Sequence, residues 1–224
     1  MGTVVSRLYG IKVDFLKDRE AFDFWYAQMP SYRKEKIDRI KVENGKLLSL
    51  GAGILLEQGL KEYGIKEAKI SLGENKKPYI DVKGADSLYF NLSHSGSMAV
   101  CAFSDSEVGT DIEQNKSFKD SLIDYVFDER EAEHILSQGK DEAERNALFT
   151  SLWTMKESIM KYYGKGITMG PKNIYVDLEG EQKIYYDKEP QNDIHLSTYT
   201  VNDYQICVCS RYSEFVQCIE MLDL

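Results

Sequence analysis

The sequence predicts an α+β fold made of two similar halves, and three observations support this prediction. First, short apolar strands and longer helices follow one another without the regular alternation that builds a parallel sheet, which indicates antiparallel sheets. Second, three short patterns recur in the same order about 100 residues apart. Third, 42% hydrophobic and 29% charged residues in a 224-residue chain are typical of a globular protein with a sizeable core.

The first half is expected to begin with a β-like run that contains one glycine and to continue with helices of alternating apolar and polar faces. In chain order the expected elements are a strand at 8–14, helices at 18–28 and 31–63 with a break near Asn44 and Gly45, a hairpin with its turn at 73–75, and a strand at 98–103. Glycine and asparagine favour a break because both tolerate non-helical backbone.

The second half is expected to repeat this plan. In chain order its expected elements are a strand at 107–113, helices at 127–138 and 141–163, and strands at 174–178, 182–187, 195–200 and 204–210. The recurring patterns pair 8–14 with 107–113, pair 70–73 and 79–81 with 176–179 and 185–187, and pair 91–93 and 100–103 with 195–197 and 206–209. We therefore expect a pseudo-dimer whose halves, residues 1–105 and 106–224, meet in a polar turn. Because such a chain supplies its own interface, we also expect a monomer.

Charge and cysteine usage exclude several classes of protein. The chain has 28 basic and 37 acidic residues, a net charge of −9, which disfavours nucleic acid because binding it needs a basic surface. No apolar run has the length of a membrane-spanning helix, and the first residues lack a signal-peptide pattern, so no membrane association is expected. The four cysteines form no CxxC motif and lie in apolar contexts, which predicts buried free thiols and a cytoplasmic protein.

Two acidic residues share one face of the strand at 107–113. Because side chains alternate along a strand, Asp111 and Glu113 point to one face while Thr110 and Ile112 point to the other. Neighbouring carboxylates repel each other unless a cation lies between them, and an all-oxygen ligand set suits Mg²⁺. These residues alone leave two interpretations open, a metal site and a solvated strand face.

The helix at 141–163 is expected to have two opposed faces. An apolar stripe with spacings of three and four residues consists of Leu148, Leu152, Met155, Ile159 and Tyr162. On the opposite side, Trp153, Glu157 and Lys161 follow one line at intervals of four. One interpretation is an exposed Glu157–Lys161 ion pair with Trp153 packed against the other half. The alternative is the wall of a cleft that carries an acid and a base.

Polar and basic segments of the first half suggest a site for an anion. Residues 91–96 combine hydroxyl groups, His94 and a glycine between two expected strands, a composition that can bind phosphate. Lys77 lies just upstream, and a basic run contains Arg33, Lys34, Lys36, Arg39 and Lys41. In a chain of negative net charge, these residues are where an anionic ligand is expected to bind.

Together these segments resemble the 4′-phosphopantetheinyl transferase superfamily, specifically its longer type, which activates peptide synthetases. The family motifs G-(I/V)-D-x-E and W-x-x-K-E-(S/A)-x-x-K are matched by residues 109–113 and 153–161. The family segments K-P and N-(I/L)-S-H-S-G are matched by residues 77–78 and 91–96. One departure is Thr110, where the family has isoleucine or valine. The four motifs occur in the family order between residues 31 and 166.

The resemblance implies a role for each matching position. Asp111, Glu113 and Glu157 correspond to carboxylates that hold Mg²⁺ against the pyrophosphate of coenzyme A, and Asp111, Glu157 and Lys161 correspond to catalytic positions. Lys161 corresponds to the lysine that contacts the phosphate. The positions that correspond to contacts with coenzyme A are Arg33, Lys36, Ser49, Lys77, Ser93, His94 and Lys161. The fold implied is a pseudo-dimer with coenzyme A between its halves.

The implied reaction transfers phosphopantetheine from coenzyme A to a serine of an acyl or peptidyl carrier protein and releases adenosine 3′,5′-bisphosphate. Two alternatives stay open at this point: a Mg²⁺-dependent hydrolase of the pyrophosphate in coenzyme A or a nucleotide, and a non-catalytic member that binds coenzyme A or a carrier protein. The intact set of Asp111, Glu113, Glu157 and Lys161 argues against a protein that only binds. The sequence does not identify the carrier protein.

Overall fold

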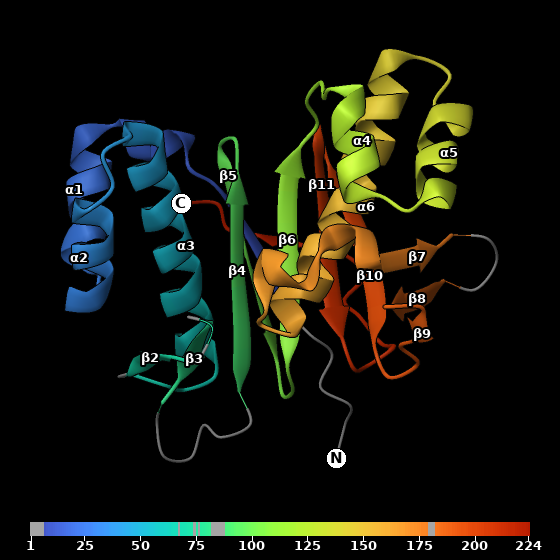
Figure 1. Cartoon of the computed structure of the whole chain (residues 1–224). Helices are drawn as coiled ribbons and strands as arrows, with labels where there is room; N and C mark the ends of the chain where they lie inside the picture. The colour runs from blue at the N-terminus through green and yellow to red at the C-terminus, as the bar shows by residue number, and fades with distance from the viewer. Residues whose placement is uncertain (1–6, 67, 74, 76, 82–87, 179–181) are drawn as a thin grey trace.

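A computed structural model of the chain describes residues 7–66, 68–73, 75, 77–81, 88–178 and 182–224. Two main sheets, antiparallel apart from one parallel strand pair, stand side by side, and helices cover each of them on the outer side (Figure 1). The predicted α+β class is therefore confirmed. None of the helices in the described ranges combines the length and the apolar character needed to cross a membrane.

The first sheet has the strand order β12-β1-β5-β4 and carries the N-terminal helices. Its strands are β1 (Arg7–Lys12), β4 (Tyr89–Ser95), β5 (Met98–Ser104) and β12 (Glu220–Met221), and its helices are η1 (Asp14–Lys17), α1 (Arg19–Ala27), α2 (Ser31–Asp38) and α3 (Glu43–Glu62). A separate two-stranded hairpin consists of β2 (Ile70–Leu72) and β3 (Pro78–Ile80). Its predicted turn includes Glu74, which lies outside the described residues.

The second sheet has the order β10-β11-β6. Its strands are β6 (Val108–Gln114), β10 (His195–Val201) and β11 (Tyr204–Ser210), and its helices are α4 (Asp120–Val126), α5 (Glu129–Gln138) and α6 (Glu142–Tyr162). The connection from α6 contains η2 (Gly166–Met169) and η3 (Pro171–Asn173), followed by a small sheet of β7 (Ile174–Asp177), β8 (Lys183–Tyr186) and β9 (Glu189–Pro190).

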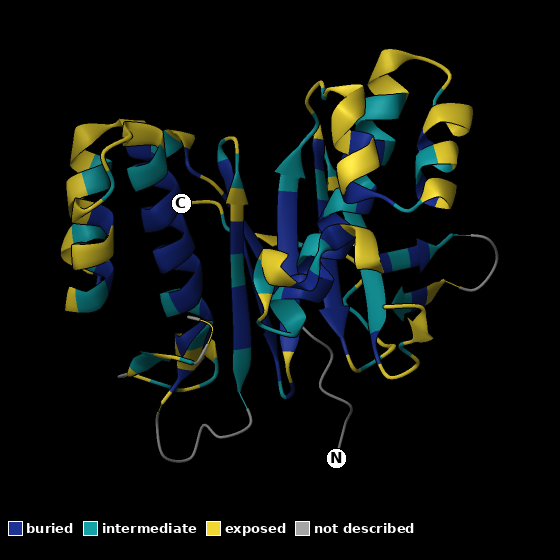
Figure 2. Ribbon diagram, in the orientation of Figure 1, coloured by how far each residue is buried: buried dark blue, intermediate teal, exposed yellow. Residues whose placement is uncertain are grey.

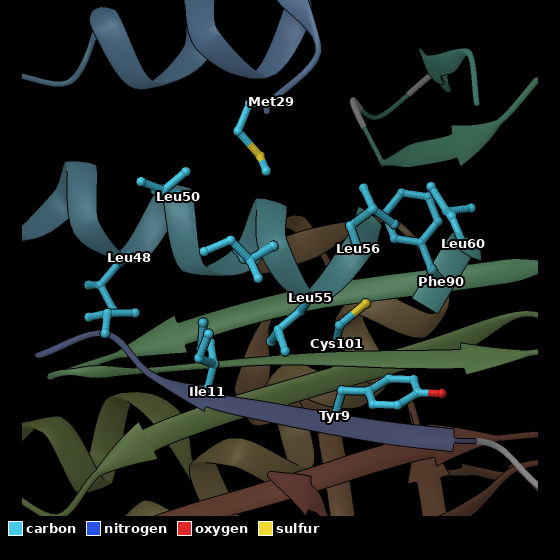
Figure 3. Close-up of a cluster of buried hydrophobic side chains, with 14 of the residues drawn as sticks. Tyr9, Ile11, Met29, Leu48, Leu50, Leu55, Leu56, Leu60, Phe90 and Cys101 are labelled. Atoms are coloured by element: carbon cyan, nitrogen blue, oxygen red, sulfur yellow. The ribbon is translucent and has the colours of Figure 1, made fainter. Parts of the chain in front are cut away.

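The core of the first half lies between α3 and the sheet. Figure 3 shows leucines of α3 above the aromatic and aliphatic side chains of the strands, among them Leu55 above Tyr9 and Ile11. Leu55 and Leu56 are fully buried, and each such burial stabilises the fold by about 1.5–3 kcal/mol. Figure 2 shows the consequence, since α3 is mostly buried while α1 and α2 remain exposed on their outer faces.

Aspartate residues fix where three helices begin. The side chain of Asp18 accepts a hydrogen bond from the backbone of Ala21, and Asp141 does the same for Glu144 at the start of α6. Asp128 and Glu131 form a capping box at the start of α5. Each cap supplies a partner for backbone N–H groups that the first helical turn leaves unpaired, which contributes about 1 kcal/mol.

Three expectations from the sequence need correction. The break after α2 lies at residues 39–42, and Asn44 and Gly45 instead belong to the first turn of α3, where a side chain at position 45 would collide with Ile40. Helix α4 was not expected, because its seven residues are too few for a clear helical period. Cys218 is exposed, whereas the other three cysteines are buried free thiols as predicted.

The two sheets have a similar internal plan. The strand order β1-β5-β4 corresponds to β6-β11-β10 when the recurring sequence patterns are matched, and every pairing in both series is antiparallel. The C-terminal residues then cross back to the first sheet, where β12 pairs with β1 in parallel and the backbone nitrogen of Leu222 donates to Gly10. The chain end therefore joins both halves.

Candidate active site

The site is built where β6 lies against helix α6. Gly109 makes this possible, because a side chain there would collide with the carbonyl oxygen of Ser158 and the backbone nitrogen of Tyr162. Asp111 follows two residues later on the same face of the strand, so it also points toward α6. The glycine of the strand motif therefore brings the helix close enough for side chains of both elements to meet.

Asp111, Lys161 and Ser93 form one hydrogen-bonded cluster drawn from three elements. The ammonium of Lys161 lies 2.6 Å from Oδ1 of Asp111 and donates to Oγ of Ser93 at 2.8 Å. The hydroxyl of Ser93 donates to the same Oδ1 at 2.7 Å. Only 5% of the Asp111 side chain is exposed, and its second oxygen, Oδ2, is buried without a hydrogen-bond partner. This buried acceptor leaves the cluster incomplete.

Glu157 lies one helical turn before Lys161 on α6 and faces the same cluster. Its pKa is raised to about 7, first by burial and then by the negative charge of Asp111, while the ammonium of Lys161 acts in the opposite direction. The carboxylate of Glu113 adds a smaller contribution in the same direction as Asp111. Both strand carboxylates thus lie close enough to Glu157 to act on its charge.

Glu113 is held at the more open end of the site. The hydroxyl of Ser95 donates to its Oε2 at 2.7 Å, and the exposed ammonium of Lys116 lies 3.8 Å from the same oxygen. A quarter of the Glu113 side chain is exposed, compared with 5% for Asp111. The strand face predicted to carry both carboxylates therefore changes from buried to accessible along its length.

The acidic residues fit a hard divalent cation by their chemistry. They offer only oxygen ligands, the buried Oδ2 of Asp111 has no partner, and Glu157 is protonated far more readily than an isolated glutamate. Among the described residues, no three acidic, histidine or cysteine side chains are gathered into a ready-made metal site. The ammonium of Lys161 lies against Asp111 instead, so a cation would meet a site in which one carboxylate already has a positive partner.

Among the predicted contacts to the nucleotide, Arg33, Lys36 and Lys161 lie close enough to His94 on β4 to act on its charge. Burial lowers its pKa, and so do the positive charges of Lys161, Lys36 and Arg33. Arg33 is only 4% exposed, and its Nε is buried without a hydrogen-bond partner. The buried hydroxyl of Ser49 on α3 is likewise unpartnered. The region therefore combines several positive charges with unused donors, which is the composition of an anion site.

Lys77 is placed apart from this cluster. Its ammonium pairs with Glu107 and donates to the carbonyl oxygens of Val108 and Tyr162, the latter at 2.9 Å. Lys77 thus links the end of the hairpin to the start of β6 and the end of α6. The structure brings Ser93, Asp111 and Lys161 together but gives Lys77 three partners of its own.

Known proteins with similar sequences decide the family. A family model described as the 4′-phosphopantetheinyl transferase superfamily matches residues 107–209. The 4′-phosphopantetheinyl transferase ffp of Bacillus subtilis is 30% identical over 222 residues, which cover 96% of this chain and 97% of the relative. The chain belongs to the 4′-phosphopantetheinyl transferase superfamily.

A second relative agrees with this assignment. The 4′-phosphopantetheinyl transferase Sfp of Bacillus subtilis strain 168 is 28% identical over 222 residues, 96% of this chain and 97% of the relative. A holo-acyl-carrier-protein synthase structure from Thermotoga maritima has a TM-score of 0.37 and 14% identity over 46% of this chain and 61% of its own. The predicted enzyme class, a 4′-phosphopantetheinyl transferase, is confirmed.

In this transferase, the two faces of helix α6 differ less in burial than its sequence predicts. Leu152, Met155 and Ile159 are buried as expected, but Lys156 is buried as well. Trp153 packs against the core of its own half, which corrects the alternative in which it covers the other half. It lines a groove of about 730 Å³ between α6 and the segment after β6 that also includes Tyr125.

A buried ion pair fixes the transferase helix α6 against its surroundings. Lys156 lies 2.6 Å from Glu131, and both side chains are at most 1% exposed. The ammonium also donates to the carbonyl oxygens of Val126, Pro171 and Ile174. Because these partners belong to four different segments, the pair sets how α6 lies and hence where Glu157 and Lys161 point.

Sequence reasoning missed three contributors to the site of this transferase. Ser95 holds Glu113, and Asn91 accepts a hydrogen bond from the backbone of Thr110 at 2.9 Å. Their alternation with Ser93 was visible in the sequence, since residues 91, 93 and 95 share one face of a strand. Glu131 gave no such signal, because its partner Lys156 lies 25 positions later and their contact depends on the tertiary fold.

Proposed function

We propose that the chain transfers the 4′-phosphopantetheine group of coenzyme A to a serine hydroxyl of an acyl or peptidyl carrier protein and releases adenosine 3′,5′-bisphosphate. The observation that carries this proposal is the cluster of Asp111, Glu157 and Lys161, in which one buried carboxylate oxygen has no partner. Transfer of a phosphoryl-linked group needs positioning and charge neutralisation more than covalent assistance. A compact set of acidic and basic groups can supply both.

Asp111, Glu113 and Glu157 are proposed to hold Mg²⁺ through their carboxylate oxygens. The ion, when bound, neutralises the pyrophosphate of coenzyme A and stabilises the charge on the departing group. The side chain of Lys161 contacts the phosphate and assists the departure of adenosine 3′,5′-bisphosphate. The 2.6 Å contact with Asp111 supports this role, because it places the ammonium beside a proposed ligand.

Glu157, directly or through a bound water, is proposed to accept the proton of the carrier serine. A pKa of about 7, raised by burial and by the charge of Asp111, suits a group that takes up a proton near neutral pH. Coordination to a cation weakens a carboxylate as a base, so the role of Glu157 as a ligand is the better supported of the two.

The nucleotide part of coenzyme A is proposed to bind along α2, α3 and β4. The residues proposed to contact it are Arg33, Lys36, Ser49, Lys77, Ser93, His94 and Lys161. The unpartnered Nε of Arg33 and hydroxyl of Ser49 support this placement, since buried donors without partners are costly unless a ligand uses them. For Lys77, binding requires that its ammonium exchange Glu107 for the ligand.

The chain is proposed to act as a monomeric pseudo-dimer in the cytoplasm, with halves 1–105 and 106–224. The shared strand order of the two sheets supports the duplication. The position of the acidic residues on β6 and α6 and of the basic residues on α2 and β4 supports binding of coenzyme A between the halves.

The proposal is tested by incubating the protein with coenzyme A, Mg²⁺ and an apo carrier protein. Intact-mass measurement is expected to show that the carrier gains about 340 Da, the mass of the group moved in a metal-assisted transfer. Release of nucleotide without this gain indicates a hydrolase, and absence of both indicates a protein that only binds. A panel of fatty-acid, polyketide and peptide carriers then identifies the preferred partner.

A further inference from the structure

The two sheets meet at strands β4 and β6 in an unusual way. In the described part of the chain, β4 ends one sheet and β6 ends the other, and the strands lie side by side in the middle of the molecule (Figure 1). Edge strands present unpaired backbone groups, which are costly when they are buried. Here side chains of β4 make the connections to β6.

Side chains at every second residue of β4 form hydrogen bonds with β6, and their partners follow in the same order along β6. Asn91 accepts from the backbone nitrogen of Thr110, and Ser93 donates to Asp111. Ser95 donates to Glu113 at 2.7 Å. Since the partners advance along β6 together with the residues of β4, the three contacts form one continuous side-chain seam. The backbones of β4 and β6 lie on either side of this seam. Two proposed metal ligands, Asp111 and Glu113, lie along it.

The hydroxyl of Ser95 both donates and accepts a hydrogen bond. It donates to Oε2 of Glu113 and accepts from the backbone nitrogen of Gln114 at 3.2 Å. A hydroxyl has one proton to donate, and Ser95 uses this proton in the hydrogen bond to Glu113. The other charged neighbour of Glu113 is Lys116, which is 3.8 Å away and 76% exposed. An exposed pair of this kind orients a carboxylate only weakly.

From this arrangement we infer that Ser95 is a positioning residue for Glu113, a role that rests on the proposed metal site. The hydroxyl fixes one carboxylate oxygen of Glu113 and ties it to the backbone of the next residue, so the carboxylate is held in place before a cation arrives. Groups that orient metal ligands in this manner commonly change metal affinity 10–100-fold when they are removed. Ser95 is thus expected to act on metal binding and not on the chemical step.

The test measures Mn²⁺ binding to the protein loaded with coenzyme A, using the spin-resonance signal of free Mn²⁺. Ser95→Ala is expected to weaken Mn²⁺ binding about tenfold. In transfer assays the Mg²⁺ concentration for half-maximal rate rises by the same factor, while kcat at saturating Mg²⁺ is unchanged. Unchanged Mn²⁺ affinity in Ser95→Ala would overturn the inference.

Two matched comparisons separate positioning from folding. Ser95→Thr and Ser95→Val have nearly the same shape, and only the threonine keeps the hydroxyl, so only Ser95→Thr should bind Mn²⁺ like the original protein. Thr110→Val removes a buried hydroxyl from the opposite face of β6, where it donates to Cys207. This variant should lower the melting temperature without changing Mn²⁺ affinity. Equal Mn²⁺ binding by Ser95→Thr and Ser95→Val, or an equal loss in Thr110→Val, would contradict a positioning role.

Asp111→Asn, measured in the same way, distinguishes failure of this inference from failure of the proposed metal site. If Asp111→Asn abolishes Mn²⁺ binding and Ser95→Ala leaves it intact, the metal site stands and the role of Ser95 is wrong. If neither variant changes Mn²⁺ binding, the metal ligands themselves are assigned incorrectly, and the inference about Ser95 falls with them.

Discussion

Helix α6 carries two lysine–carboxylate pairs only five residues apart, and they differ in almost every physical respect. The Lys156–Glu131 pair is sealed in the core, at most 1% exposed, and its ammonium has three further carbonyl partners. The Lys161–Asp111 pair is partly open, with 26% of the lysine side chain exposed and one aspartate oxygen unpartnered. A buried pair whose ammonium has further hydrogen-bond partners is typical of a structural role. The unpartnered oxygen of Asp111 and the access to solvent instead indicate a site that binds a ligand.

The largest expected effect comes from breaking the sealed pair. Lys156→Met leaves Glu131 charged and buried without its cation, which should cost about 3–5 kcal/mol of the free energy of unfolding. Urea denaturation measures this as a lower midpoint at unchanged slope. Adding Glu131→Gln should restore part of the loss, because the buried charge is then gone. A loss below about 1 kcal/mol, the range of surface pairs, would contradict a structural role for this pair.

The next effect concerns activity at the open pair. Asp111→Ala, and separately Glu157→Ala, should reduce metal-dependent transfer more than about a hundredfold, since each removes a proposed metal ligand. Both variants should stay folded, because neither side chain belongs to a hydrophobic core cluster. The carrier mass assay gives the rate, and Thr110→Val serves as a control on the same strand. Normal rates in either alanine variant would refute the site assignment.

Lys161→Met sharpens the contrast between the two pairs. It leaves one buried carboxylate oxygen of Asp111 without its ammonium, which should cost about 1–3 kcal/mol in metal-free buffer, less than Lys156→Met. Mg²⁺ should recover this loss in Lys161→Met, because a cation then reaches Asp111. Mg²⁺ should not restore the stability of Lys156→Met, because the site of the Lys156–Glu131 pair is closed to solvent. Thermal melts of both variants with and without Mg²⁺ provide the comparison.

The smallest expected effect is a pH dependence set by Glu157. Its pKa is raised to about 7 in the folded protein, so between about pH 4.5 and 7 the folded state binds more protons than the unfolded state. The contribution of Glu157 to stability is therefore complete below about pH 4.5 and is lost as the pH rises toward 7. Glu157→Gln should flatten this slope in metal-free buffer. An identical slope in both proteins would mean that the pKa of Glu157 is not raised in the folded protein.

Much of the fold and the motif positions could be predicted from the sequence because they depend on local periodicity. Alternation along β6 placed Asp111 and Glu113 on one face, and the apolar stripe of α6 placed Leu152, Met155 and Ile159 in the core. Helix α4 escaped prediction because a helix of seven residues shows too little of its period. Trp153 was misjudged because helical spacing gives a direction but not the element that covers it.

The site itself depended on which distant segments meet. Motif residues Ser93, Asp111 and Lys161 were visible in the sequence, but their shared hydrogen bonds join strands and a helix that lie up to 68 positions apart. The same holds for the burial of Arg33, which the basic run around it would place on a solvated helix face. Contacts of this kind are set by packing of whole elements, which local patterns do not encode.

By itself, the sequence determined the class of fold, the order of the longer elements and the chemistry available at each motif, because strand and helix periods and residue types are local properties. Only the tertiary structure decided that Lys156 is sealed with Glu131 while Lys161 stays open beside Asp111. The two lysines lie on one helix, and what separates them is the direction each takes from its axis. That difference in direction follows from the helical period, but what each lysine meets depends on how α6 packs against β6 at Gly109 and against the partners of Lys156, so burial and its electrostatic consequences follow from packing.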